Sequence, residues 1–215
     1  MAIESSKAPL LYVIGDRGAF KKDHEWLEAL SMAANSLLTH ENVALQVRVK
    51  GSCSISRFRR MQLARTKLDS AIQDGLRVFL NGTITQAQRL GFTHVHLKEE
   101  LLNKPAPNPD NLGIATSTHS IESIKKSAGI GASFCVFGPV YVPKSKNAKP
   151  VGVETLRQIV AQSPLDVLAL GGITQERVAP CLDAGAKGVA CISSVMRSAN
   201  PDKSIRNLLE AAKSR

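Results

Sequence analysis

Eight short apolar segments alternate with helical patterns along the chain, and this alternation is the feature that most constrains the fold. The expected strands are residues 10–14, 44–50, 76–80, 94–97, 112–116, 134–137, 166–170 and 188–192. Helical patterns occupy residues 23–38, 54–74, 85–90, 120–128, 153–162 and 202–212, and a further helix is expected after Thr174. Alternation of this kind indicates parallel strands, and eight parallel strands close a barrel. The sequence therefore predicts an α/β protein, a (β/α)8 TIM barrel, with one domain over residues 1–215.

An open doubly wound sheet is the alternative architecture. It is disfavoured because no G-x-G-x-x-G sequence follows the first expected strand, and that motif marks the dinucleotide-binding version of the open sheet.

The turns after the last two expected strands combine glycine with serine. Gly171 and Gly172 stand where a strand passes into a helix, so their backbone N–H groups can approach an anion without a Cβ in the way. The last strand ends at Ile192, Ser193 and Ser194, whose amides and hydroxyls would complete such a cradle. Either turn alone is also typical of an ordinary strand-to-helix connection. Together they favour a phosphate site, which barrels of this class carry in the loops after strands seven and eight.

Polar residues alternate with apolar ones in the second expected strand. Gln46, Arg48 and Lys50 occupy one face of it. In a parallel barrel the outer face packs on helices, so the polar set is expected to point inward and to converge on the mouth. Burying Arg and Lys without an anionic partner is costly. An anionic ligand at the mouth is therefore expected.

The charge of the chain favours acidic partners in general. The formal net charge is +10, but the basic residues are spread, with clusters only at residues 21–22, 57–65 and 144–149. Aromatic residues make up 4% of the chain, which argues against base-stacking platforms for nucleic acid. We expect a phosphorylated small-molecule substrate rather than a nucleic acid.

The cysteines and the hydropathy pattern point to a cytoplasmic protein. The four cysteines show no CxxC spacing, and Cys135 and Cys191 fall inside apolar strands, so we expect reduced core residues. No apolar run reaches the length of a membrane helix, and no basic-then-apolar signal pattern opens the sequence, so no membrane contact is expected. The oligomeric state stays open, with a homodimer as one alternative.

Several short motifs, in their order and spacing, resemble the thiamine phosphate synthase and TenI family over nearly the whole chain. They are residues 11–17 (LYVIGDR), 46–50 (QVRVK), 117–120 (STHS), 137–141 (FGPVY) with Lys146, 170–173 (LGGI) and 188–193 (GVACIS).

The resemblance implies a ligand for each side of the barrel mouth. A thiamine phosphate synthase joins a pyrimidine pyrophosphate to a thiazole phosphate, with Mg²⁺ on the departing pyrophosphate. By the resemblance Gly172, Ile192 and Ser193 would bind the thiazole phosphate. The residues that would face the pyrimidine and its pyrophosphate are Gln46, Arg48, Lys50, Asn81, Ser117 and Lys146.

Two departures from the synthase pattern concern the metal. The family's Asn-Asp pair is Asn81-Gly82 here, and the acid expected after the fourth strand falls on Leu101. Mg²⁺ needs carboxylate oxygens, so no metal ligand is assigned and no cofactor is expected, apart from Mg²⁺ if the protein is a synthase. Glu99 or Glu100 would then have to replace a missing ligand. A threonine expected before the basic loop is also replaced, by Pro143.

The TenI branch consists of thiazole tautomerases, which need neither pyrophosphate nor metal. Under that reading His119 would be the acid/base, since histidine suits proton transfer near neutral pH, and Lys50 or Arg48 would hold the substrate carboxylate. Gly138-Pro139, however, is nearer to the synthase form.

Three functions remain open at this point. The first is a thiazole tautomerase, or a divergent synthase with an altered Mg²⁺ site; the second is a thiamine phosphate synthase proper; the third is a non-catalytic member that binds a phosphate ligand. His119 is equally explained as polar filler at a helix start, and His94 and His96 are expected to be structural. Asp16 is expected to pair with Arg17 or to line the mouth. Whether residues 144–149 close over the site as a lid is left open.

Overall fold

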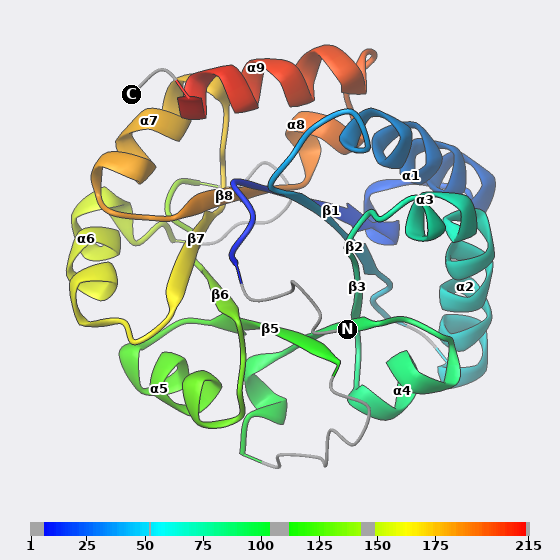
Figure 1. Ribbon diagram of the computed structural model, residues 1–215, viewed down its shortest axis with the longest axis horizontal. Coiled ribbons are helices and arrows are strands. Elements are labelled where there is room, and N and C mark those ends of the chain that lie inside the picture. Colours follow the sequence, from blue (N-terminus) through cyan, green and yellow to red (C-terminus); the bar gives the residue numbers. More distant parts are fainter. Residues whose placement is uncertain (1–6, 52, 104–111, 143–148, 214–215) are drawn as a thin grey trace.

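The computed structural model describes residues 7–51, 53–103, 112–142 and 149–213. Eight parallel strands form a closed barrel in the order β1 to β8, which confirms the predicted TIM barrel (Figure 1). The strands are β1 (Leu11–Asp16), β2 (Val43–Arg48), β3 (Val78–Asn81), β4 (His94–Leu97), β5 (Gly113–Thr118), β6 (Phe134–Phe137), β7 (Asp166–Leu170) and β8 (Gly188–Cys191).

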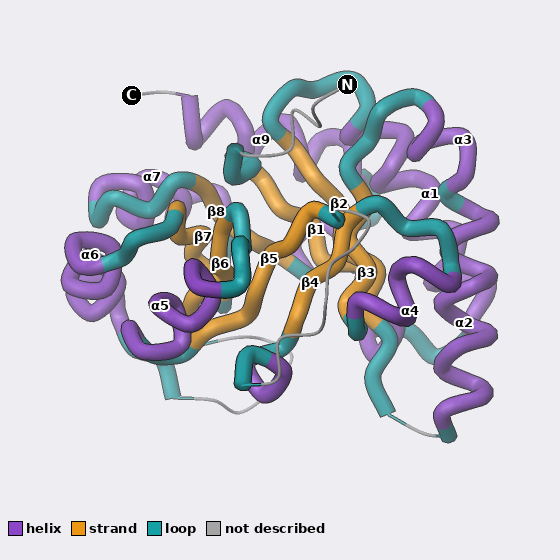
Figure 2. The backbone as a smooth tube through the Cα atoms, turned by 60° about the horizontal axis from the view of Figure 1, so that its bottom comes forward, coloured by secondary structure: helices purple, strands orange, loops and turns teal. Residues whose placement is uncertain are grey.

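Helices form a ring outside the strands, as Figures 1 and 2 show. They are α1 (Asp23–Leu37), α2 (Ser54–Lys67), α3 (Asp69–Gln73), α4 (Ile84–Arg89), α5 (Ile121–Gly129), α6 (Gly152–Gln162), α7 (Gln175–Asp183), α8 (Ser193–Met196) and α9 (Pro201–Lys213). Two 3₁₀ helices, η1 (Arg17–Ala19) and η2 (Glu99–Leu101), follow β1 and β4. No helix in these ranges has the length and apolar character that crossing a membrane requires.

Three local features differ from the sequence prediction. The single helix expected over residues 54–74 breaks at Leu68, whose backbone leaves the helical region at φ −101° and ψ 7°. β5 continues to Thr118, so Ser117 lies inside the strand rather than after it. A short helix, α8, begins directly at Ser193, where only a strand end was expected.

Aromatic side chains fill the barrel interior near the amino ends of the strands. Tyr12, Phe79 and Phe134 are fully buried and meet edge to face, with every ring-centroid distance 5.5 Å. Edge-to-face pairs add to the roughly 1.5–3 kcal/mol that burying each ring contributes. A truncation such as Phe79→Ala is expected to cost about 3–5 kcal/mol. This packed layer fills the barrel interior near the amino ends of the strands, so ligands have to enter from the carboxyl ends.

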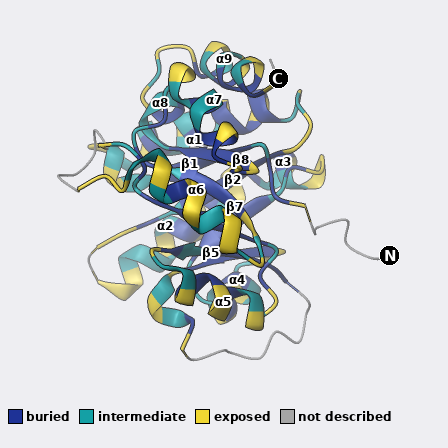
Figure 3. Cartoon of the chain, turned by 90° about the vertical axis from the view of Figure 1, so that its left-hand side faces the viewer, coloured by how far each residue is buried: buried dark blue, intermediate teal, exposed yellow. Residues whose placement is uncertain are grey.

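A second apolar layer lies between the strands and the helices, and in Figure 3 the strands are dark blue while the outward helix faces are yellow. α1 packs so closely on β1 that a Cβ at Gly15 would lie 2.2 Å from Leu30 Cδ2. The indole of Trp26 in α1 donates to the Gly15 carbonyl at 3.1 Å. Cys135 and Cys191 are free and buried, and burial raises their pKa values to about 11 and about 12.

Candidate active site

A cavity of about 1620 Å³ opens at the carboxyl ends of the strands. This exceeds the roughly 300–1,000 Å³ common for small-molecule sites, so a ligand with two separate groups fits. The cavity brings together nine of the ten site residues predicted from the sequence, namely Gln46, Arg48, Lys50, Asn81, Ser117, His119, Gly172, Ile192 and Ser193. The tenth, Lys146, lies outside the described residues, as does Pro143.

The ends of β7 and β8 lie side by side at this mouth. The strands pair in register through Leu170 and Ala190, immediately before the glycine and serine turns. The hydroxyl of Ser194 donates to the Ile173 carbonyl and ties the two turns together. Gly172 has φ +61°, and an added Cβ would lie 2.7 Å from a backbone oxygen. Only glycine fits this turn without strain.

Protein donors hold the carbonyl groups of the turn after β7. Gly171 O accepts from the Tyr141 amide at 3.1 Å, and Gly172 O accepts from Arg177 Nη1 at 2.7 Å. In a trans peptide the N–H points opposite to the preceding C=O, so the amides of this turn are directed away from those donors. Within the described ranges, no protein group accepts a hydrogen bond from the amides of Gly172 and Ser193.

Arg177 is a residue that the sequence reasoning missed. Besides holding Gly172 O, its guanidinium lies 4.6 Å from the centroid of the Tyr141 ring, so it joins the loop after β6 to the turn after β7. A signal was available, because Arg177 stands in the first turn of α7, where the helix dipole favours acidic residues.

On the opposite side of the mouth, Gln46 and Arg48 of β2 line the cavity, as predicted, together with Lys50, which follows the strand because β2 ends at Arg48 rather than at residue 50. Gln46 is buried, Arg48 is partly buried, and Lys50 is exposed. Arg48 forms an ion pair with Asp16 of β1, because strand register places these two residues side by side. The expected pairing of Asp16 with Arg17 is therefore wrong; Arg17 turns outward and pairs with Asp23 of α1.

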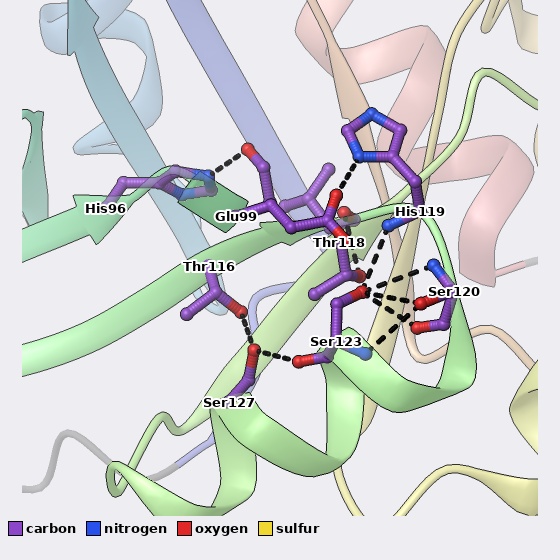
Figure 4. Close-up of polar contacts among 10 residues, drawn as sticks. His96, Glu99, Thr116, Thr118, His119, Ser120, Ser123 and Ser127 are labelled. Carbon is purple, nitrogen blue, oxygen red and sulfur yellow. Dashed lines mark hydrogen bonds and ion pairs between the residues drawn. The ribbon is translucent and has the colours of Figure 1, made fainter. Parts of the chain in front are cut away.

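His119 follows β5 and meets Glu99 of η2 at the rim of the mouth, and a dashed line joins the two side chains in Figure 4. The contact is an ion pair when His119 is protonated. Ser120 caps α5 by accepting from the Ser123 amide at 3.2 Å, which fixes the backbone next to His119. The chain reversal at this cap presents the imidazole to the rim, where 61% of the side chain is exposed.

His94 and His96 are both buried on the inner face of β4. Burial lowers the pKa of His94 to about 4 and the pKa of His96 to about 3, with a smaller contribution from nearby arginine charges. Both are therefore neutral near pH 7. His96 contacts Tyr12 and Ser117, and it lines the floor of the mouth.

Fold and mouth together define a (β/α)8-barrel protein with a large cavity at the carboxyl ends of its strands. The sequence matches the family model described as thiamine monophosphate synthase over residues 11–195. It is 28% identical over 170 residues to the thiamine-phosphate synthase of Bacillus velezensis, covering 77% of this chain and 76% of that protein. It is 34% identical over 155 residues to a putative thiamine-phosphate synthase of Geobacter sulfurreducens, covering 69% of this chain and 72% of that one.

Among solved structures, thiamine phosphate pyrophosphorylase from Pyrococcus furiosus superimposes with a TM-score of 0.72 at 23% identity, covering 97% of each chain. That likeness supports the fold. The chain belongs to the thiamine monophosphate synthase family, which places it among the proteins of thiamine biosynthesis. The family implies a phosphorylated small-molecule substrate.

Proposed function

We propose that this protein binds a thiazole phosphate at the barrel mouth and moves a proton on the thiazole ring, as a tautomerase. His119 is the acid/base, Glu99 is its partner, and the turns after β7 and β8 hold the phosphate. The observation that carries the proposal is the contact between His119 and Glu99 at the open rim of the mouth.

The His119–Glu99 pair has the arrangement of a general acid/base. With the Nδ1 hydrogen donated to the Glu99 carboxylate, Nε2 is the nitrogen that takes up and returns a proton. The carboxylate stabilises the imidazolium that forms in between. Removing a proton from one ring carbon and returning one at another position shifts a double bond and makes the ring aromatic. The reaction then needs no other reactant.

The phosphate end of the substrate fits the backbone of the turns after β7 and β8. Gly172 and Ser193 line the cavity, while the Gly171 and Gly172 carbonyls are held by protein donors. Amides that carry no competing acceptor suit a phosphate ester. Arg48 and Lys50 stand across the mouth, where they would hold a carboxylate on the ring.

The residues at the two family metal positions do not fit Mg²⁺. Gly82 has no side chain, and Leu101 packs partly buried against the apolar core. The carboxylates of Asp16 and Glu99, both at the mouth, are occupied by Arg48 and His119. No group of three metal-binding side chains occurs in the described ranges. A reaction that needs no metal agrees with this set of residues.

The second candidate is a thiamine-phosphate synthase with a rebuilt metal site. The names of the B. velezensis and G. sulfurreducens relatives favour it, and so does a cavity large enough for two ligands. In that case Glu99, after leaving His119, or Glu100, which also lines the cavity, would supply a carboxylate.

Two assays on the purified protein separate the candidates. The first follows aromatisation of the thiazole carboxylate phosphate tautomer in the presence of EDTA. The second supplies pyrimidine pyrophosphate, thiazole phosphate and Mg²⁺ and measures thiamine phosphate. We expect turnover in the first assay, a loss of about 10²–10⁴-fold in kcat for His119→Ala, and a loss of about tenfold for Glu99→Gln, as for one charge-assisted hydrogen bond.

His24→Ala is the matched control, because His24 of α1 is also exposed but is not among the residues that line the cavity. Unchanged turnover in His119→Ala would remove His119 from the mechanism. Thiamine phosphate formed only with Mg²⁺ would favour the synthase, and turnover in neither assay would favour a protein that binds the phosphate ligand without chemistry.

A further inference from the structure

A chain of hydrogen bonds crosses the barrel interior below the mouth and links four strands. Gln46 Nε2 of β2 donates to the Tyr12 hydroxyl of β1 at 3.2 Å. The Tyr12 oxygen lies 3.2 Å from His96 Nδ1 of β4, and His96 Nε2 lies 2.8 Å from Ser117 Oγ of β5. The Tyr12 and His96 rings are stacked, with centroids 5.8 Å apart and planes inclined by 25°. Gln46, Tyr12 and His96 are almost completely buried.

The orientation of the Gln46 amide, with Nε2 toward Tyr12, sets the direction of every bond in this chain. The pKa of His96 is lowered to about 3, chiefly by burial, so at neutral pH the ring carries a single N–H. The Tyr12 oxygen accepts from Gln46, which leaves the hydroxyl hydrogen to be donated to His96 Nδ1. The remaining hydrogen of His96 is then on Nε2, and it is donated to Ser117 Oγ.

Both ends of the chain reach the mouth, and they have opposite character. Gln46 and Ser117 line the cavity. Gln46 Oε1 is buried and has no hydrogen-bond partner among the described residues, so it can accept a hydrogen bond from a ligand. Ser117 already accepts from His96, so its own hydrogen remains for donation. Turning the Gln46 amide by 180° would reverse all three bonds and exchange the two roles.

We propose that Tyr12 and His96 are positioning residues that couple Gln46 to Ser117, so that the mouth presents an acceptor at Gln46 together with a donor at Ser117. A ligand group seated there donates to Gln46 and accepts from Ser117. Both ring nitrogens of His96 are used within the chain, and Tyr12 lies in the packed layer beneath the cavity, so neither acts by touching the reacting atoms. This inference concerns binding polarity and stands whether or not His119 is catalytic.

The tautomer of His96 tests the direction of the chain without any ligand. In protein labelled with ¹⁵N in histidine, correlations between ring protons and ring nitrogens identify which nitrogen carries the hydrogen. We expect neutral His96 with the hydrogen on Nε2 in the wild type. In Tyr12→Phe, which removes one hydroxyl and keeps the ring, we expect a mixture of tautomers. Thr116→Val is the matched control, because the Thr116 hydroxyl is equally buried on β5 but donates to Ser127.

Coupling between the two ends is tested with the side-chain amide signals of Gln46, assigned from their absence in Gln46→Leu. Ser117→Ala is expected to shift these signals, and Tyr12→Phe is expected to abolish that response. The proposal is overturned if His96 carries its hydrogen on Nδ1 in the wild type, or if the His96 signals are the same in Tyr12→Phe. It is also overturned if the Gln46 signals do not change in Ser117→Ala. Cooperative melting of each variant shows that the fold is retained, and Phe79→Leu serves as a second packing control if Tyr12→Phe loosens the interior.

Discussion

The two sides of the barrel mouth are built in different ways. On the side of β7 and β8 the backbone supplies polar groups, and side chains such as Arg177 and Ser194 donate hydrogen bonds to its carbonyls. On the side of β1, β2, β4 and β5 the polar groups are side chains, joined in pairs and chains across strands. A backbone cradle recognises any phosphate ester, whereas a side-chain network selects a particular ligand. We expect the first side to supply affinity and the second to supply specificity.

The largest expected effect is on the backbone side. Gly172→Val places a Cβ 2.7 Å from the Val142 carbonyl oxygen at a positive φ. The turn therefore has to move, and its amide groups no longer point at the phosphate. Losing two charge-assisted hydrogen bonds predicts roughly a thousandfold weaker binding of thiazole phosphate, about 4 kcal/mol. Isothermal titration calorimetry measures the dissociation constant of thiazole phosphate for each variant. Gly131→Ala, a positive-φ glycine with open space around it, is the control; equal losses in both variants would refute a specific cradle.

On the side-chain side, acid is expected to destabilise the fold. The pKa values of His94 and His96 are lowered from 6.5 to about 4 and about 3, so the unfolded chain binds more protons between those values and 6.5. The stability that comes from the neutral histidines is present above pH 6.5. It is lost as the pH decreases below 6.5, with a slope that approaches about 1.4 kcal/mol per pH unit for each histidine. For His96 alone the loss is ~2 kcal/mol between pH 6.5 and 4.5.

Urea unfolding at a series of pH values measures this slope. His96→Gln is expected to make it shallower by about 1.4 kcal/mol per pH unit. The same slope in the wild type and in His96→Gln would show that His96 is not held neutral. The lowered pKa of Asp23 acts below 3.8, outside the window that matters here.

An intermediate effect is expected at Arg177. Arg177→Gln removes the charge that holds Gly172 O and stacks on Tyr141, and about tenfold weaker phosphate binding follows from one charge-assisted hydrogen bond. Arg177→Lys is expected to restore little, since a lysine does not reproduce the planar stacking. Arg206→Gln, on α9 and paired with Asp202 of the same helix, is the surface control. Binding that is unchanged in Arg177→Gln would mean that the turn keeps its shape unaided.

The smallest effect is expected at the ion pair between β1 and β2. Asp16→Asn leaves Arg48 without its anionic partner, so an anionic ligand should bind a few-fold more tightly while the protein loses about 1 kcal/mol of stability. Thermal melting and calorimetry measure both, with Asp69→Asn breaking the Arg65 pair far from the mouth as control. Weaker anion binding in Asp16→Asn would show that Asp16 orients Arg48 rather than neutralising it.

The same contrast explains what the sequence could predict. Strand and helix periodicity and the Gly171-Gly172 turn are local patterns, so the barrel and the adjacency of Gly172 and Ser193 followed from them. The partners of Asp16, Tyr12 and His119 come from other strands or loops. Such pairs depend on strand register and loop placement, which no single segment encodes. α8 is only one turn long, too short to leave a periodic pattern.

We propose that the turns after β7 and β8 hold a phosphate ester through their amides. Titration of an ¹⁵N-labelled sample with thiazole phosphate measures this contact. The amide signals of Gly172 and Ser193 are expected to move downfield together, with one shared dissociation constant, and Gly172→Val is expected to abolish the response. Binding that leaves both signals in place while signals elsewhere move would show that the phosphate is held somewhere other than at these two turns.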